Sequence, residues 1–194
     1  MHSRGTKCRR RRGGQVRSEG DRIEAAKGVR AEVIAPIKRI IITILAATLS
    51  SAALAEIIGR ASVIDADTIE IHGQRIRLHG IDAPEKGQPC FDASGTSYRC
   101  GQIAAMALDG FIGASPVTCR ERDTDRYGRT VATCAVRGVD IEAWLVRNGH
   151  AFAYRRYSSD HIGAEQEAKN AKRGLWAGSA QPPWEWRKDR RGGL

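Results

Sequence analysis

The sequence predicts an α+β protein built on a small, closed, five-stranded β-barrel with about three helices. Three observations support this fold class. Short runs of alternating apolar and polar residues with turn residues between them fill the region before residue 81, a helical pattern then precedes two further strands, and helical patterns follow residue 139. Strands that succeed one another through short turns favour an antiparallel meander, which a small barrel can close.

Three strands are expected first: Ile57–Ile64, Thr68–His72 and Arg75–Gly80. The second and third are joined by Gly73-Gln74, a tight connection of the kind that hairpins use. Successive side chains of a strand point to opposite faces. We therefore expect Ile76 and Leu78 to be buried, while Arg77 points to the other side.

Apolar residues at helical spacing predict helices in three segments: Gln102–Ile112, Asp140–Asn148 and Asp160–Lys172. In the first segment, Ile103, Met106, Ala107 and Phe111 should form the buried face, and Gly113 should end the helix. The segment before it, residues 86–99, contains Gly, Pro and Ser and is expected to be a loop.

The last two strands are expected at Pro116–Glu121 and Thr130–Arg137, joined by the polar turn DTDRYGR. Residues 151–154 are compatible with one more short strand. Five short strands with a helix inserted after the third are typical of barrels of the oligonucleotide-binding (OB) type.

Residues 1–55 are typical of an N-terminal extension that ends in a secretory signal peptide. A basic region precedes the apolar run Ile40–Leu49 and the small-residue ending Ala53-Leu54-Ala55. Cleavage is predicted after Ala55, which would make the protein secreted or periplasmic, with no stable membrane association. The alternative is a membrane anchor, for which the run is shorter than the roughly 20 apolar residues that a span needs.

The rest of the chain is expected to form a folded domain, residues 56–178, and a basic tail, residues 179–194. The whole chain has a net charge of +10, but residues 56–194 carry 20 basic and 18 acidic side chains, a net +2. This balance favours local contacts between arginines and phosphates over a broad cationic face. In the tail, Trp184 and Trp186 either pack on the domain or stack on single-stranded nucleic acid.

The mature segment contains four cysteines, an even number that agrees with export and with disulfide bonds. Of the three possible pairings, we favour Cys90–Cys100, which closes a short loop, and Cys119–Cys134, which joins two consecutive strands. A structural zinc site is the alternative, although no CxxC spacing is present.

Acidic residues gather between Val63 and Glu85, in the sequence VIDADTIEIHGQRIRLHGIDAPE. Asp67 precedes the second expected strand, and Asp82 follows the third, which contains Arg77. Carboxylates so arranged favour a hard cation such as calcium or magnesium. A cation held there could bind a phosphate oxygen, while Glu85 activates water as a general base. Arg77 and Arg129 could hold the non-bridging oxygens as charge develops. This chemistry suits phosphodiester hydrolysis.

The motifs IDADTI, RIRLHGIDAPE, DTDRYGR and NGHAFAY, in this order and spacing, resemble the staphylococcal nuclease family. The resemblance runs from about residue 58 to residue 176. It implies an exported, calcium-dependent nuclease with an OB-type fold. Such an enzyme cleaves DNA and RNA with little sequence preference and leaves 3′-phosphate ends.

The resemblance also implies roles for individual residues. The positions that match the catalytic residues of the family are Arg77, Glu85 and Arg129. The positions that match its calcium ligands are Asp67, Asp82 and the backbone carbonyl of Ala83, with Asp65 as a nearby acid. Tyr127 and Tyr154 fall at or near positions that line its nucleotide pocket.

Ala66 departs from the family pattern, because the family often has glycine there. If this position needs a positive φ, alanine would cost about 1 kcal/mol and could displace Asp67. A second hypothesis for the whole protein is a non-catalytic OB module that binds nucleic acid. The acids and both arginines of the motifs favour the enzyme, for which we expect a monomer.

Overall fold

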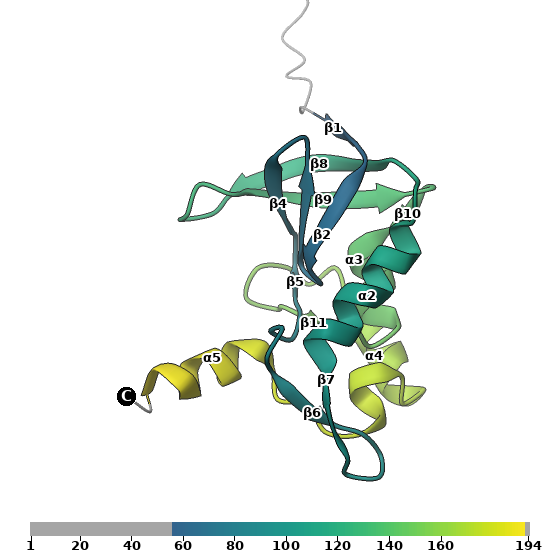
Figure 1. The fold of residues 1–194 in the computed structure, drawn as a ribbon, viewed down its shortest axis with the longest axis vertical. Helices are drawn as coiled ribbons and strands as arrows, with labels where there is room; N and C mark the ends of the chain where they lie inside the picture. The colour runs from purple at the N-terminus through teal and green to yellow at the C-terminus, as the bar shows by residue number, and fades with distance from the viewer. Residues whose placement is uncertain (1–55, 193–194) are drawn as a thin grey trace, which may run out of the picture. The chain divides into compact units, whose positions relative to one another are not determined.

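The computed structural model describes residues 56–192, so the predicted signal peptide and its cleavage site lie outside the described part. This part contains a seven-stranded sheet, two two-stranded sheets, four α-helices and one 3-10 helix. Figure 1 shows the large sheet at one end, with α2 and α3 running away from it toward the small sheets. The predicted α+β class is confirmed, with one more helix than expected.

The large sheet follows the order β1-β8-β9-β4-β3-β2, and β10 pairs with β9. Its strands are β1 (Glu56–Gly59), β2 (Ala61–Asp65), β3 (Thr68–Ile71), β4 (Gln74–Leu78), β8 (Val117–Thr124), β9 (Thr130–Val136) and β10 (Val139–Asp140). The segment predicted as one strand, 57–64, is thus divided between two strands, and β1 pairs with β8 instead of continuing the meander. In the described residues the ladders form an open path from β1 to β2, and barrel closure is not detected.

The meander β2-β3-β4 and the hairpin β8-β9 meet where β4 and β9 pair in parallel. Ile76 lies opposite Thr130, and Leu78 lies opposite Ala132. As the alternation predicted, Ile76 and Leu78 are buried, whereas Arg77 lies on the other face and is only half-buried. This junction pairs sequence motifs that are about fifty residues apart in the middle of the sheet.

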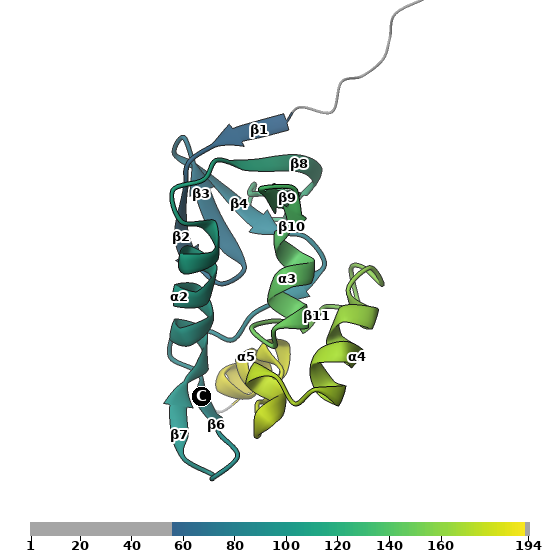
Figure 2. The ribbon, with the colours of Figure 1, turned by 90° about the vertical axis from the view of Figure 1, so that its right-hand side faces the viewer.

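The helices are α2 (Cys100–Ile112), α3 (Ile141–Arg147), α4 (Ile162–Asn170) and α5 (Pro183–Gly192), with the 3-10 helix η1 (Gly174–Ala177) before the last. Figure 2 shows α2 and α3 beside each other below the sheet, with α4 next to α3. The side chain of Asp140 caps α3 by accepting a hydrogen bond from the backbone N–H of Ala143 at 2.6 Å.

The predicted buried face of α2 is wrong at Ile103 and Met106, whereas Ala107 and Phe111 are half-buried and Phe111 packs on the main core. Ile103 and Met106 are 51% and 64% exposed, and the buried residues are Cys100, Gly101, Ala104, Leu108 and Ile112. The helix ends at Gly113, as predicted, with a φ of 56° that suits glycine. At Gly101 the helix lies too close to the Glu85 loop for a larger side chain, and the same face buries Leu108 and Ile112.

Residues 86–99, expected to be a loop, contain a small hairpin. Its strands are β6 (Pro89–Phe91) and β7 (Ser97–Arg99), and a disulfide between Cys90 and Cys100 ties it to the start of α2. The second disulfide, Cys119–Cys134, joins opposed positions of β8 and β9. Both favoured pairings are present in the structure. The other two-stranded sheet pairs β5 (Ile81–Asp82) with β11 (Phe152–Ala153).

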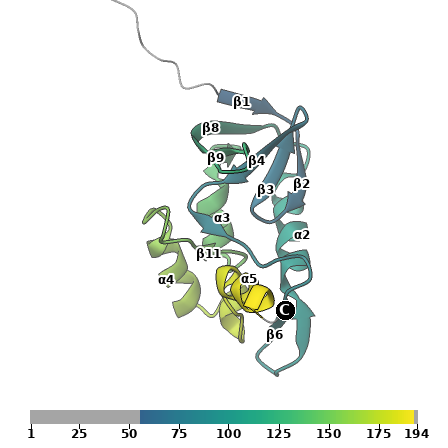
Figure 3. The same cartoon turned by 90° about the vertical axis from the view of Figure 1, so that its left-hand side faces the viewer.

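Residues 179–194 were expected to be a basic tail, and the structure forms α5 in this segment. Figure 3 shows α5 close to β11 and β6. Pro183 is buried, and Trp184 packs on a second hydrophobic cluster with Phe152 and Trp176. Within the described residues, no helix is long and apolar enough to cross a membrane.

Candidate active site

Antiparallel pairing of β3 with β4 sets Asp67 beside Arg77. Thr68 lies opposite Arg77, and the backbone N–H of Leu78 donates to the carbonyl of Asp67 at 2.9 Å. One guanidinium nitrogen of Arg77 then lies 3.0 Å from Asp67 Oδ2 and 3.0 Å from Asp82 Oδ1. A single arginine therefore bridges the two carboxylates that the sequence assigns to the cation.

Asp82 belongs to β5, a two-residue strand held in place by β11. Asp82 lies opposite Phe152, and its side chain is completely buried. The next residue, Ala83, is buried as well, and its N–H lies 3.4 Å from Asp67 Oδ2. Asp67, Asp82 and Ala83, the three predicted cation ligands, thus come from two strand ends that meet at one point.

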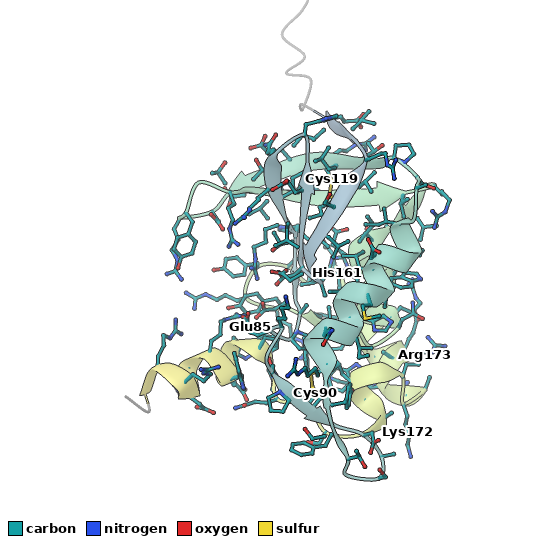
Figure 4. The ribbon with its side chains drawn as sticks, viewed as in Figure 1. Glu85, Cys90, Cys119, His161, Lys172 and Arg173 are labelled. Carbon is teal, nitrogen blue, oxygen red and sulfur yellow. A yellow bond between two sulfur atoms is a disulfide. The ribbon has the colours of Figure 1, made fainter. Side chains whose placement is uncertain are left out.

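The loop that contains Glu85 is fixed by buried neighbours. Gln88 is fully buried, and its Oε1 accepts a hydrogen bond from the backbone N–H of Glu85 at 3.2 Å. On the other side, α2 packs so closely that a Cβ on Gly101 would lie 2.3 Å from the Glu85 carbonyl oxygen. The Glu85 side chain itself remains 39% exposed, so it can reach solvent (Figure 4).

The carboxylates of the cluster have unequal proton affinities. Burial raises the pKa of Asp65 to about 7, with the charge of Asp67 acting in the same direction. Burial also raises the pKa of Asp82 to about 6, although a hydrogen bond from Arg187 opposes this. Burial acts to raise the pKa of Asp67 too, but the charge of Arg77 and several hydrogen bonds hold it below its ordinary value. Asp67 is therefore ionised across the neutral range.

Arg187, on α5, is a residue of this site that the sequence reasoning missed. Its two terminal nitrogens lie 2.6 Å from Asp82 Oδ2 and 2.7 Å from Glu85 Oε1. A helix signal was present in PPWEWRKDRR: proline at the first position, Glu185 in the first turn and two arginines in the last. The contact of Arg187 with Glu85 joins residues more than a hundred positions apart, so no local sequence pattern predicts it.

Arg129 is held apart from the carboxylates, in the turn between β8 and β9. Its Nε donates to Asp125 Oδ2 at 2.8 Å, and its guanidinium lies 5.6 Å from the ring centre of Tyr127. Asp125 also accepts hydrogen bonds from the backbone N–H groups of Tyr127 and Arg129. The described contacts of Arg129 are thus with its own turn, and Tyr127 is 70% exposed.

Tyr154 follows β11 and faces α5. Its ring stacks on that of Trp184, with centroids 5.1 Å apart and planes 7° from parallel. A cavity of about 740 Å³ opens beside this pair. Its lining includes Trp176, Trp184 and the cations Arg155, Arg156, Lys169, Lys188 and Arg191. Trp184 therefore packs on the domain, the first of the two roles expected for it.

Ala66 causes no backbone strain. The non-glycine residues with positive φ in the described part are His72, Arg137 and Lys172, so Ala66 is not left-handed. Its side chain is completely buried in the main core. The expected penalty for alanine at this position is therefore absent, and Asp67 keeps its contact with Arg77.

The donor set fits a hard cation. Asp67, Asp82 and the carbonyl of Ala83 offer only oxygen atoms, as calcium prefers. Two guanidinium groups lie against these carboxylates, which shows that the cluster favours positive charge. Among residues 56–192, no group of three or more His, Cys, Asp or Glu side chains could hold a metal ion. A calcium ion would therefore need the backbone carbonyl, water and substrate to complete its six to eight ligands.

Comparison with known proteins places the chain in a family. The profile described as staphylococcal nuclease homologue matches residues 75–178. A succinoglycan biosynthesis protein of Rhizobium meliloti, ExoI, is 45% identical over 145 residues, which cover 73% of this chain and 75% of that protein. The micrococcal nuclease of Shigella flexneri is 32% identical over 144 residues, 65% of this chain and 77% of that protein.

A plant relative is larger. The probable staphylococcal-like nuclease CAN3 of Oryza sativa is 35% identical over 128 residues, 64% of this chain but 31% of that protein. This chain therefore spans less than a third of the rice protein. The profile match nevertheless covers Arg77, Asp82, Glu85 and the β8-β9 hairpin, and the chain belongs to the staphylococcal nuclease homologue family.

Proposed function

We propose that the protein is a calcium-dependent nuclease that hydrolyses DNA and RNA with little sequence preference and leaves 3′-phosphate ends. The observation that carries this proposal is the bridge of Arg77 between Asp67 and Asp82, with Glu85 on the adjoining loop. Relatives described as nucleases support it, as does the cationic and aromatic cavity beside Tyr154. The OB-type barrel that the family implies and export after cleavage at Ala55 are parts of the same proposal.

Each side chain of the cluster has a proposed role. A cation bound at Asp67 and Asp82 would polarise a phosphate oxygen. Glu85, exposed and beside these ligands, takes a proton from the attacking water. Arg77, which contacts both of these carboxylates, would donate to a non-bridging oxygen of the phosphate.

Arg129 would act on the phosphate from the turn between β8 and β9. Asp125 and the turn backbone orient its guanidinium, and about a third of the Arg129 side chain is exposed. A fork held in this way can grip phosphate oxygens as negative charge grows in the transition state. Tyr127, next to Arg129, and Tyr154 are the rings proposed to contact the nucleotide.

The test is cleavage of labelled DNA and RNA by the purified protein with calcium, with EGTA, and with calcium restored after EGTA. We expect cleavage in the first and third conditions alone. The labelled products should each lose one 3′-phosphate when they are treated with phosphatase. Activity that survives EGTA and needs magnesium would contradict the calcium assignment. Tight binding of DNA without cleavage would favour the alternative, a non-catalytic OB module.

A further inference from the structure

Arg187 makes the densest set of polar contacts in the candidate site. Its Nη2 lies 2.6 Å from Asp82 Oδ2, and its Nη1 lies 2.7 Å from Glu85 Oε1 and 3.3 Å from Asp82 Oδ1. These are charge-assisted bonds in the two-pronged geometry that guanidinium forms with carboxylates. Arg187 lies beyond residues 75–178, the part of the chain that matches the family profile.

The helix that carries Arg187 is docked firmly on the domain. Trp184, three residues earlier, stacks on Tyr154 and meets the edge of the Phe152 ring at 5.9 Å. The carbonyl of Gln181 accepts a hydrogen bond from the buried Gln88 at 2.7 Å. Because its start is held by these contacts, the backbone of α5 can stay in place while the Arg187 side chain moves.

Arg187 and Arg77 together occupy both oxygens of Asp82. Arg77 is bonded to Oδ1 at 3.0 Å, and Arg187 is bonded to Oδ2 at 2.6 Å. A cation that binds Asp82 must share or replace one of these contacts, since two positive groups near one oxygen repel each other. The Arg187 side chain is 32% exposed, so it is the one with room to leave.

A second cavity next to the carboxylates offers space for the Arg187 guanidinium when it leaves Asp82. This cavity of about 300 Å³ is lined by Glu85, Trp186, Arg187, Arg190 and Arg191. Three of these five side chains are arginines, and Arg190 lies over the Trp186 ring at 4.8 Å. A cavity with this lining suits an anionic phosphate of a nucleic-acid strand, and Arg187 links it to Asp82, which it bonds at 2.6 Å.

We propose that Arg187 is a substrate-binding arginine that neutralises Asp82 and Glu85 in the absence of a cation and binds a backbone phosphate once a cation takes its place. This inference rests on the proposed nuclease function. It makes α5 part of the active site, and it predicts opposite effects of Arg187 on the binding of the cation and of the nucleic acid. The arginine competes with the cation and assists the nucleic acid.

The first test is calorimetric titration of the substrate-free protein with calcium. Arg187→Gln should bind calcium about tenfold more tightly than the wild type, because the competing charge is gone. Arg187→Lys, which keeps the charge but not the fork, should fall between the two. The matched control is Arg120→Gln, which breaks an exposed ion pair with Glu56 on the large sheet and should bind calcium as the wild type does.

The second test is steady-state cleavage of a single-stranded oligonucleotide at saturating calcium. Arg187→Gln and Arg187→Lys should raise KM about tenfold and change kcat little, since Arg187 contributes binding and not a proton. Arg120→Gln should leave both constants unchanged. Thermal melting of every variant shows whether α5 is still docked.

Unchanged or weaker calcium binding by a folded Arg187→Gln would overturn the inference, and so would an unchanged or lower KM. If Arg187→Gln does not fold, Arg187→Lys decides by the same two measurements. A wild type that cleaves DNA with calcium while its Arg187 variants behave normally refutes the inference alone. A wild type that neither binds calcium nor cleaves DNA refutes the proposed function as well.

Discussion

At the scale of single residues, Arg77 and Arg187 compensate a cluster of carboxylates that would otherwise repel one another. Asp82 is completely buried, and each of its oxygens is bonded to one of the two arginines. Burying a charge without such partners would cost several kcal/mol. The positive charge of these arginines therefore keeps the carboxylates together until a cation arrives.

Glu85→Gln should lower kcat on DNA by about a hundredfold or more, because the amide cannot take a proton from water. The fold should persist, since the Glu85 side chain is 39% exposed. Melting temperature and kcat should be measured together. Glu167→Gln, which removes a carboxylate from an exposed ion pair with Arg147, is the matched control and should retain activity. A fully active Glu85→Gln would remove Glu85 from the mechanism.

Arg129→Lys should lower kcat by about a hundred- to a thousandfold, the usual cost of removing one donor to the transition state. Lysine keeps the charge but cannot bond Asp125 and a phosphate in the same plane. Asp125→Asn leaves the Arg129 guanidinium in place and removes its charged partner, so its kcat should fall less. Wild-type kinetics in Arg129→Lys would refute the assigned role.

At the scale of elements, the Cys90–Cys100 disulfide connects stability to the position of Glu85. It ties the β6-β7 hairpin to the first residue of α2, and the next residue, Gly101, packs on the Glu85 backbone. The Cys119–Cys134 disulfide instead joins two strands that are already paired along their length. The two bonds should therefore contribute differently to activity.

Replacing either cysteine pair by alanine should lower the free energy of unfolding by about 3 kcal/mol, as expected for loops of 10 and 15 residues. Loss of Cys90–Cys100 should also lower kcat, because α2 can then shift against Glu85. Loss of Cys119–Cys134 should leave kcat near the wild-type value. Urea denaturation and kinetics at one temperature measure both effects, and equal losses of kcat would contradict the connection to Glu85.

Local pattern predicted most of the elements, and the errors have physical causes. The meander, the β8-β9 hairpin and three helices follow from alternation and helical spacing. The face of α2 does not, because Ala104 and Gly101 are buried by close backbone packing while Met106 is exposed. The charges of α5 concealed its helix, whose stability depends on the packing of Trp184.

At the scale of the whole molecule, the candidate site is assembled by contacts that no local pattern specifies. The sequence identified Asp67, Asp82 and Glu85 because they lie in one motif around Arg77. Arg187 was missed because an arginine in a basic segment is expected to be solvated, and only tertiary packing brings it to Asp82. Local motifs thus predict the chemistry of the site but not its complete boundary.

Glu142 connects α3 to the large sheet, and it makes the free energy of unfolding depend on pH. Its side chain is buried and accepts hydrogen bonds from the backbone N–H of Cys134 at 3.0 and 3.2 Å. Burial, helped by the charge of Asp140, raises the pKa of Glu142 well above 4.5. The folded protein therefore holds a proton that the unfolded chain releases, and this contribution to stability is lost as pH rises toward the folded pKa.

Glu142→Gln should be more stable than the wild type above neutral pH, because glutamine needs no proton. The difference should disappear below about pH 4, where both states of the wild type are protonated. Urea denaturation at several pH values measures this. A variant that is less stable at every pH would show that the bonds of Glu142 to Cys134 outweigh its protonation.

The distances along the chain between the partners of the site determine when the site can exist. The strand of Asp82 is held by β11, which lies seventy residues later in the chain. The charge of Asp82 is balanced by Arg187, 105 residues later. The contacts of Asp82 with β11 and with Arg187 can therefore form only after residues 152 and 187, respectively, have been synthesised.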